Sequence, residues 1–241
     1  MPALSAYSSE LDYSYAPGIF PSMECLTWRG KTVRRVLIHS SAEGREGTEK
    51  LTALAENLHV RVETADRALG RISGKENCYA AAVFGKWKDE LEKGKPHVVL
   101  HNPGDSGNVG TILRTALGLG VENVALIRPC VDVFDPKTVR ASMGSLFRMR
   151  LKIYESFADY EEEFRGKPLY PFMLDASRPL AEVTKGKIPK DFTLVFGNEG
   201  RGLPKEFAGK GQPVRIESNE KVDSLNLGIA AAIGIYEFMK C

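Results

Sequence analysis

Short apolar runs alternate with amphipathic stretches along most of the chain, and this alternation predicts a fold built from strands and helices. A first series is expected from Thr32 onward, with strands at 33–39, 60–62 and 79–84 and helices at 48–58 and 65–69. A longer series follows Pro96, with strands at 98–100, 124–127, 149–154, 169–175, 193–196 and 214–216 and helices at 111–119, 137–143, 158–164 and 225–239. Such alternation predicts an α/β fold with a mainly parallel sheet and helices on both faces.

The same pattern divides the chain into three parts. Residues 1–24 lack periodicity and mix Ser, Tyr, Pro and Gly, so we expect a loosely packed leader, which could still fold against the rest. Residues 25–95 form a small α/β unit that ends in the charged stretch 86–95, a short helix or linker. The boundary is placed at Pro96, so that residues 96–241 form the larger domain.

Two glycine-rich turns follow predicted strands, and a third polar motif precedes the last helix. The first turn lies in His-Asn-Pro-Gly-Asp-Ser-Gly-Asn-Val-Gly-Thr-Ile-Leu-Arg-Thr-Ala, residues 101–116, and the second in Phe-Gly-Asn-Glu-Gly-Arg-Gly-Leu-Pro, residues 196–204. The third, Asp-Ser-Leu-Asn-Leu at 223–227, precedes a helix without charge over 227–236, which predicts burial on every side. Ligands of open parallel sheets bind beyond the carboxyl ends of the strands, where both turns fall.

Composition changes this picture little. The chain has 241 residues, of which 43% are hydrophobic and 27% charged, which is ordinary for a globular protein with a sizeable core. The longest charge-free apolar segment is shorter than the roughly 20 residues that a bilayer span needs. The N-terminus has no basic region followed by an apolar core, so no secretory signal is expected and the predicted location is the cytoplasm.

The residues that most often hold metals are poorly arranged for it. Four cysteines, at positions 25, 78, 130 and 241, are widely spaced and form no Cys-x-x-Cys, which favours reduced thiols over a disulfide framework or a zinc site. His97 and His101 lie at the two ends of a predicted strand, and a spacing of four residues along a strand does not bring two side chains to the same metal ion. We therefore expect no metal.

The three motifs, in this order, resemble the TrmH/SpoU branch of the SPOUT RNA methyltransferases over about residues 96–240, together with the string Arg140-Ala-Ser-Met-Gly-Ser-Leu-Phe-Arg-Met. The resemblance implies S-adenosylmethionine as methyl donor and a ribose 2′-hydroxyl of RNA as acceptor. It also implies a C-terminal trefoil knot and a homodimer to which the last helix contributes. Residues 25–95 resemble the family's ribosomal-protein-like RNA-binding domain through Arg35-Val-Leu-Ile-His and Leu69-Gly-Arg-Ile-Ser-Gly.

The resemblance gives Arg114 the position of the catalytic arginine, six residues after Asn108. Two roles remain open: a base whose guanidinium is perturbed by its site, or a cation that stabilises the developing alkoxide and grips the adjacent phosphate. On a helical wheel Arg114 falls at the edge of the apolar arc. Asn108 is an N-cap candidate by residue type and is also expected to orient the arginine. Glu199 could pair with Arg114 or hold the substrate ribose.

Further site residues follow from the same resemblance. Gly197, Ile216 and Leu225 match positions whose main chain contacts the adenosyl part of the cofactor. Ser224 and Asn226 match the pair of the third motif; the structural alternative is helix capping by Asp223 or Ser224, and Asn226 is placed too late to cap.

Net charge is only +2, so RNA binding depends on local basic clusters. Such clusters are equally often solvated faces, but next to these motifs phosphate contact is the better interpretation. The candidate RNA-binding residues are Arg34, Arg35, Arg140, Arg148 and Arg150.

Other function classes fit less well. Gly118-Leu-Gly-Val-Glu-Asn lacks the third glycine of a dinucleotide-binding turn, and Gly70-Arg-Ile-Ser-Gly-Lys-Glu lacks the spacing of a phosphate-binding loop. A non-catalytic RNA-binding protein on the same fold remains open, and so does transfer RNA as substrate. The extra N-terminal domain favours ribosomal RNA, because compact family members that act on transfer RNA often lack it.

Overall fold

The computed structural model describes residues 4–73, 78–176, 178–219 and 223–240, which fall into two compact units. The first comprises the chain up to Trp87 together with Asp132–Arg148, and the second comprises Lys88–Val131 and the chain from Met149 onward. The division after Trp87 differs from the boundary expected at Pro96. Residues 132–148, expected in the larger domain, belong to the first unit, because Val139, Leu146 and Phe147 are buried there and Phe147 packs edge-on against Phe84.

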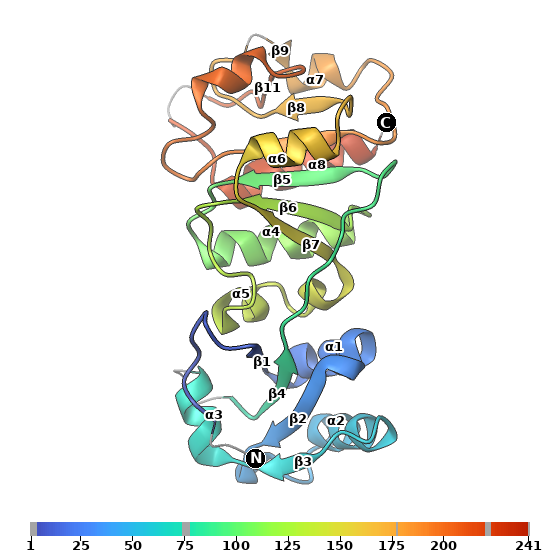
Figure 1. The fold of residues 1–241 in the computed structure, drawn as a ribbon, viewed down its shortest axis with the longest axis vertical. Coiled ribbons are helices and arrows are strands. Elements are labelled where there is room, and N and C mark those ends of the chain that lie inside the picture. The colour runs from blue at the N-terminus through green and yellow to red at the C-terminus, as the bar shows by residue number, and fades with distance from the viewer. Residues whose placement is uncertain (1–3, 74–77, 177, 220–222, 241) are drawn as a thin grey trace. The chain divides into compact units, whose positions relative to one another are not determined.

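The first unit is built on a four-stranded sheet in the order β1-β4-β2-β3 (Figure 1). β1 (Tyr13–Pro17) and β2 (Val33–Ile38) run antiparallel to β4 (Ala80–Gly85), and β3 (Val62–Thr64) runs parallel to β2. The helices of this unit are α1 (Ile19–Arg29), α2 (Glu46–Asn57), α3 (Asp66–Ser73) and α5 (Pro136–Ala141). Short 3₁₀ turns lie at Gly30–Thr32, Ser40–Ala42 and Ser145–Arg148.

The prediction of a loosely packed leader is wrong for residues 13–24. Tyr15 and Ala16 of β1 are fully buried, and the buried Ser22 hydroxyl of α1 donates to the Ala16 carbonyl and accepts from the Ala82 amide, both at 2.8 Å. This strand and helix could not be recognised from the apolar pattern because their buried positions include serines. The serine hydroxyls can be buried because they form hydrogen bonds with backbone groups. Residues 86–95, expected as a short helix or linker, contain no helix.

The second unit contains a five-stranded parallel sheet in the order β7-β6-β5-β10-β8. Its strands are β5 (His97–His101), β6 (Asn123–Ile127), β7 (Arg150–Tyr154), β8 (Leu169–Pro171) and β10 (Thr193–Phe196), and a small parallel pair joins β9 (Arg178–Pro179) to β11 (Val214–Arg215). The predicted mainly parallel α/β fold is confirmed. The predicted strand at 169–175 is shorter than expected, since β8 ends at Pro171.

Helices cover both faces of this sheet (Figure 1). One set of inward positions, including Val99, Ala125 and Val195, packs with Phe157 and Tyr160 of α6 (Phe157–Glu163). Side chains alternate along a strand, so the neighbouring positions face α4 (Ser106–Gly118) and α8 (Leu227–Met239). On that side Gly234 of α8 lies against the rings of Phe172 and Phe196. The remaining helices are α7 (Leu180–Val183) and the 3₁₀ turn Lys205–Gly209.

The last helix is not buried on every side, contrary to the expectation from its composition. Leu227, Gly228, Ala231, Gly234, Ile235 and Phe238 form its buried face. On the other side Ile229 is 53% exposed and Tyr236 is 54% exposed. An uncharged helix can therefore leave an apolar stripe uncovered within one chain. Among the described helices, none is both long and apolar enough to cross a membrane.

Candidate functional site

The three sequence motifs meet beyond the carboxyl ends of β5 and β10, which are neighbours in the sheet. A chain of side-chain hydrogen bonds joins them. Asn108 of α4 donates to Glu199 Oε1 at 3.3 Å, and Asn226 donates to Asn108 Oδ1 at 3.0 Å. Residues from all three motifs are thus held in one cluster, as the sequence predicts for its glycine-rich turns.

Glu199 is the centre of this cluster. Its Oε2 accepts from the Gly104 amide at 3.0 Å and from Asn198 Nδ2 at 3.2 Å, and its Oε1 accepts from the Asp105 amide at 3.1 Å as well as from Asn108. Burial raises the pKa of the Glu199 carboxyl, but these hydrogen bonds outweigh burial and hold the pKa below its ordinary value. The carboxylate is therefore ionised at neutral pH and ties the loop after β10 to the loop after β5.

The first helix of the site begins one turn earlier than the predicted cap implies. Asp105, rather than Asn108, is the N-cap of α4, and its carboxylate accepts from the Asn108 amide at 2.7 Å. Asn108 lies within the first turn, so its side chain is available for Glu199 and Asn226. The capping prediction for Asn108 is wrong because Asp105 already occupies the cap position.

At the third motif, a residue that was predicted not to cap its helix does cap it. Asn226, predicted to come too late to cap, is the N-cap of α8, and its Oδ1 accepts from the amides of Gly228 at 2.8 Å and Ile229 at 3.3 Å. Asp223 and Ser224 precede the helix start by several residues and do not cap it. Asn226 thus uses its oxygen to start α8 and its amino group to hold Asn108.

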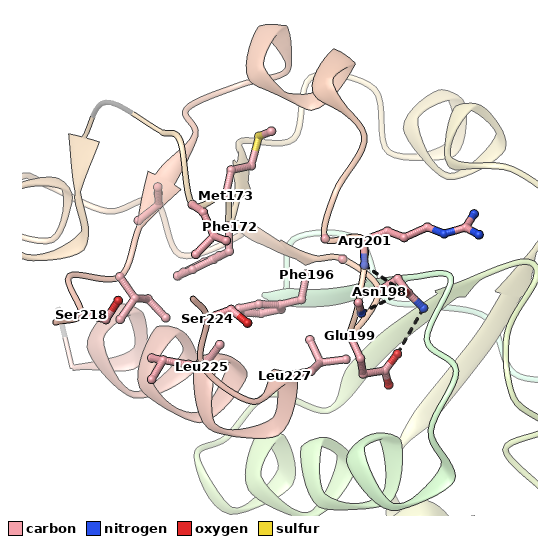
Figure 2. Close-up of a pocket in the computed structure, with 17 residues that line it drawn as sticks. Phe172, Met173, Phe196, Asn198, Glu199, Arg201, Ser218, Ser224, Leu225 and Leu227 are labelled. Carbon is pink, nitrogen blue, oxygen red and sulfur yellow. Dashed lines mark hydrogen bonds between the residues drawn. The ribbon is translucent and has the colours of Figure 1, made fainter. Parts of the chain in front are cut away.

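The loop after β10 is shaped by Asn198, a residue that sequence reasoning did not single out (Figure 2). Its Oδ1 accepts from the amides of Gly200 at 3.0 Å and Arg201 at 3.2 Å, and its Nδ2 donates to the Asn102 carbonyl at 2.9 Å. Asparagine commonly closes such turns through its side chain. Its position directly before Glu199 in the second motif is the signal that could have identified it.

A pocket opens between the loop after β10 and the segment that leads into α8 (Figure 2). Gly197, Ile216, Leu225 and Ser224 line it, which places all four predicted residues around one hollow. Phe172 and Phe196 add stacked rings with centroids 4.5 Å apart. Apolar side chains combined with main-chain donors and acceptors suit a flat aromatic ring that carries polar substituents.

Arg114 lies outside this cluster. Its side chain is exposed on α4 and forms no hydrogen bond or ion pair with any residue that the structure describes. The alternative in which Glu199 pairs with Arg114 is therefore absent from this chain, because the four contacts of Glu199 come from other donors. The guanidinium is left available for an anion from outside the chain.

The five basic candidates for RNA contact differ in their surroundings. Four are paired with acids inside their own unit: Arg34 with Asp12, Arg35 with Glu63, Arg148 with Glu24 and Arg150 with Glu92, at 2.7 to 2.8 Å. The Arg35 side chain is only 11% exposed. Arg140 forms no ion pair with a described acid and is half-buried. Pairing lowers the charge that these clusters offer to phosphate, so their role in RNA binding stays a prediction.

No group of three or more His, Cys, Asp or Glu side chains in the described part of the chain is arranged to hold a metal ion. What the site offers instead is an ionised, fully bonded carboxylate, two asparagines and a pocket of aromatic rings and main-chain groups, with the uncommitted side chain of Arg114 outside the cluster on α4. This set can bind and orient polar organic molecules.

Comparisons with known proteins agree with this geometry. The family model described as the SpoU rRNA Methylase family matches residues 95–236. A Synechocystis protein described as an uncharacterized tRNA/rRNA methyltransferase is 34% identical over 154 residues, which are 63% of this chain and 55% of that protein. The matched segment thus spans about half the length of this relative.

Solved structures extend the likeness. The AdoMet-bound rRNA methyltransferase of Sinorhizobium meliloti, 24% identical, superposes with a TM-score of 0.79 over 95% of this chain and 87% of its own, which shows the fold. A second structure, concerned with 2-OH methylation of C/U34 on tRNA, is 30% identical with a TM-score of 0.56. It covers 61% of this chain and 95% of its own.

Proposed function

The chain belongs to the SpoU rRNA methylase family, and on that premise we propose that it transfers a methyl group from S-adenosylmethionine to a ribose 2′-hydroxyl of RNA. The observation that carries this proposal is the hydrogen-bonded cluster of Asn108, Glu199 and Asn226 beside the pocket. It brings the three motifs into one site, as this chemistry requires.

The pocket fits the adenosyl part of the cofactor. Phe172 and Phe196 offer flat apolar surfaces, while the main chain of Gly197, Ile216 and Leu225 offers amides and carbonyls for the polar edge of an adenine. S-adenosylmethionine supplies an electrophilic sulfonium methyl when bound. The S. meliloti relative was solved with AdoMet, which supports the same cofactor here.

Two tasks remain for the protein: aligning the hydroxyl with the methyl carbon, and easing the loss of the hydroxyl proton to solvent water as S-adenosylhomocysteine leaves. A ribose hydroxyl has a pKa of roughly twelve or higher, so stabilising the alkoxide lowers the barrier substantially. We assign this to Arg114 as a cation, since an arginine remains protonated at neutral pH and this one has no partner among the described residues. Ser224 lines the pocket and is available to contact the substrate.

The direct test is calorimetry of the full chain with S-adenosylmethionine, followed by transfer of a labelled methyl group to isolated ribosomal and transfer RNA. We expect saturable cofactor binding and ribose methylation of one RNA class. No binding at millimolar cofactor would refute the enzyme function. Cofactor-independent RNA binding without transfer would instead favour a non-catalytic RNA-binding protein.

Gly197 offers a test of the pocket itself. A Cβ at residue 197 would lie 2.2 Å from the Gly202 carbonyl carbon and 2.3 Å from the Leu203 nitrogen, so Gly197→Ala must displace the loop. We expect calorimetry to show cofactor affinity lowered by at least about tenfold, because the pocket shares this loop.

Gly200→Ala in the same loop is the matched control. Its Cβ would meet only Asn198 Oδ1, at 3.8 Å, so affinity should stay within about twofold of wild type. Equal affinities for both variants would contradict the assignment of this pocket to the cofactor.

Ribosomal RNA is the substrate class that we favour. The tRNA-modifying structure covers 95% of its own chain but only 61% of this one, so it has no counterpart for much of this chain. The match with the S. meliloti rRNA methyltransferase covers 95% of this chain. The first unit is accordingly proposed to bind RNA, and its candidate residues are Arg34, Arg35, Arg140 and Arg148. Arg150 of the second unit is a further candidate. Mapping ribose methylation in RNA from cells with and without the protein tests this choice.

A homodimer is the assembly that α8 favours. Its exposed stripe of Ile229 and Tyr236 is apolar, and such a stripe next to polar neighbours is typical of an interface. The family resemblance adds a trefoil knot, and the return of the chain from β10 to α8 past the pocket is compatible with it. We also propose the cytoplasm as the place where the protein acts.

Tyr236→Glu tests the dimer. A charge in the middle of an apolar interface remains desolvated and unpaired, so we expect the molar mass from light scattering to fall from that of two chains to that of one. Phe20→Glu, at an aromatic side chain of the first unit with 53% exposure, is the control and should leave the mass unchanged. A wild-type mass of one chain would contradict the proposal.

A further inference from the structure

A second hollow lies along the loop after β10 and is distinct from the pocket proposed for the cofactor. Its walls are three loops that follow parallel strands: residues 102–104 after β5, residues 129–131 after β6, and the segment from Asn198 to Pro204 after β10. The cavity measures about 850 Å³, within the range of small-molecule sites.

The position of this hollow relates it to the chemistry. It shares Asn198, Arg201 and Gly202 with the cofactor pocket, so a single loop separates the two. Gly104, which donates its amide to Glu199, lines it from the other side. A molecule seated here therefore lies next to the cluster where the three motifs meet.

The walls are rigid and carry little charge. Pro103, Pro129 and Pro204 line the cavity. The Asn102 side-chain amide donates to the Arg128 carbonyl at 2.5 Å, and the Val131 backbone amide donates to the Pro103 carbonyl at 3.0 Å. Proline rings present flat apolar surfaces, and committed polar groups leave these surfaces to dominate. Such walls suit the face of an aromatic heterocycle.

Arg201 gives the hollow its charge. Among the described residues that line it, Arg201 is the one that is ionised, and its side chain forms no ion pair with a described acid. Arg201 lines both hollows, and Figure 2 shows its side chain pointing away from Phe172, Met173 and Leu225 of the cofactor pocket. Its backbone amide is held by Asn198, which fixes where the side chain starts.

We infer that this hollow receives the base of the nucleotide whose ribose is methylated, and that Arg201 binds a phosphate next to that nucleotide. The inference rests on the proposed function. A base lying between the proline walls places its sugar at Gly104 and the Glu199 cluster, beside the cofactor pocket. The acceptor must then be unstacked from its neighbours, as is usual where proteins read single bases in RNA. Arg201 is a positioning residue in this arrangement, because it touches phosphate and not the reacting oxygen.

The test uses the full chain saturated with S-adenosylmethionine and a single-stranded RNA of mixed sequence, about 12 nucleotides long, that contains 4-thiouridine. Irradiation followed by peptide mass spectrometry locates the crosslinked bases. We expect crosslinks in the peptides that contain residues 102–104 and 129–131. Crosslinks confined to the first unit would overturn the inference.

Arginine variants sharpen this test. Arg201→Ala is expected to weaken binding of the same RNA about tenfold and to raise the KM for RNA without lowering cofactor affinity. Lys205→Ala is the matched control, since it removes one positive charge from an exposed residue four positions further on that does not line the hollow. Equal weakening by the two variants would mean general electrostatic attraction and would overturn the inference.

Arg201→Lys separates charge from shape. It keeps the charge but lacks the planar fork of donors, so RNA affinity should recover only in part. Calorimetry with S-adenosylmethionine on the same samples reports on the proposed function independently. Loss of cofactor affinity in Arg201→Ala would assign Arg201 to the cofactor and overturn the inference, while absent binding in the wild type would refute the methyltransferase function itself.

Discussion

Arg114→Ala is expected to lower the rate of methyl transfer by at least about 100-fold while S-adenosylmethionine affinity stays within a few fold. The reason is that Arg114 lies outside the residues that line the cofactor pocket and has an uncommitted guanidinium. Its proposed contribution is made only as the 2′-oxygen gains negative charge, so kcat should fall rather than cofactor binding. Single-turnover transfer from labelled cofactor, together with calorimetry, measures both quantities.

Arg165→Ala is a suitable control for this variant. Arg165 is an exposed arginine of the same unit and has no ion pair with a described residue, so its removal changes net charge equally. Near-normal turnover in Arg114→Ala would refute the catalytic role. A lysine at position 114 discriminates between the two open roles: a stabilising cation predicts partial activity, whereas specific two-point binding of phosphate by a guanidinium predicts little.

Glu199→Gln is expected to disturb the whole site although it changes only one atom. Each carboxylate oxygen accepts from two donors, so the amino group of glutamine must face two N–H groups in place of an acceptor. We expect methyl transfer to fall at least about tenfold and the local free energy of opening to fall by about 2 kcal/mol. Hydrogen exchange of the Gly104 and Asp105 amides measures the second effect.

This variant also separates two roles for the carboxylate. A general base needs an unoccupied lone pair directed at the hydroxyl and a pKa raised towards neutrality. Glu199 has committed oxygens and a lowered pKa, which is typical of a structural anion. If Glu199→Gln abolished transfer without faster exchange of the two amides, Glu199 would be a base, and the interpretation as a structural tie would be wrong.

Lowering the pH should weaken the contacts of the Glu199 carboxylate in the wild type, as Glu199→Gln does at neutral pH. A carboxyl whose pKa is lowered by folding stabilises the native state fully at pH values above its ordinary value of 4.5, and this contribution is lost as the pH falls through the lowered value. The difference in the free energy of opening between wild type and Glu199→Gln, obtained from exchange rates corrected for the pH dependence of intrinsic exchange, should therefore be constant near neutral pH and shrink below about 4.5.

Much of the second unit could be predicted because its strands are continuous apolar runs between glycine-rich turns. The sheet buries these strands on both faces, so periodicity and turn signals agree. The convergence of the three motifs follows from the same pattern, since parallel strands place their carboxyl ends at one edge.

Contacts between distant residues could not be predicted in the same way. Asp223, Ser224 and Asn226 are all good cap residues, and which of them caps α8 depends on where packing starts the helix. Asn108 and Asp105 pose the same choice at α4. β1 escaped detection because Ser14 is buried and its hydroxyl donates to the Phe134 carbonyl, more than a hundred residues away.

The placement of residues 132–148 means that the polypeptide passes between its two units three times, after Trp87, after Val131 and after Arg148. No single cut can then release one unit intact. A fragment that begins at residue 96 would retain Val139, Leu146 and Phe147 without the strands that cover them, and we expect it to aggregate. The unit that carries the site is thus encoded by two separate segments, and residues 132–148 of the other unit are synthesised between them. The second segment can join the first only after residues 132–148 have left the ribosome.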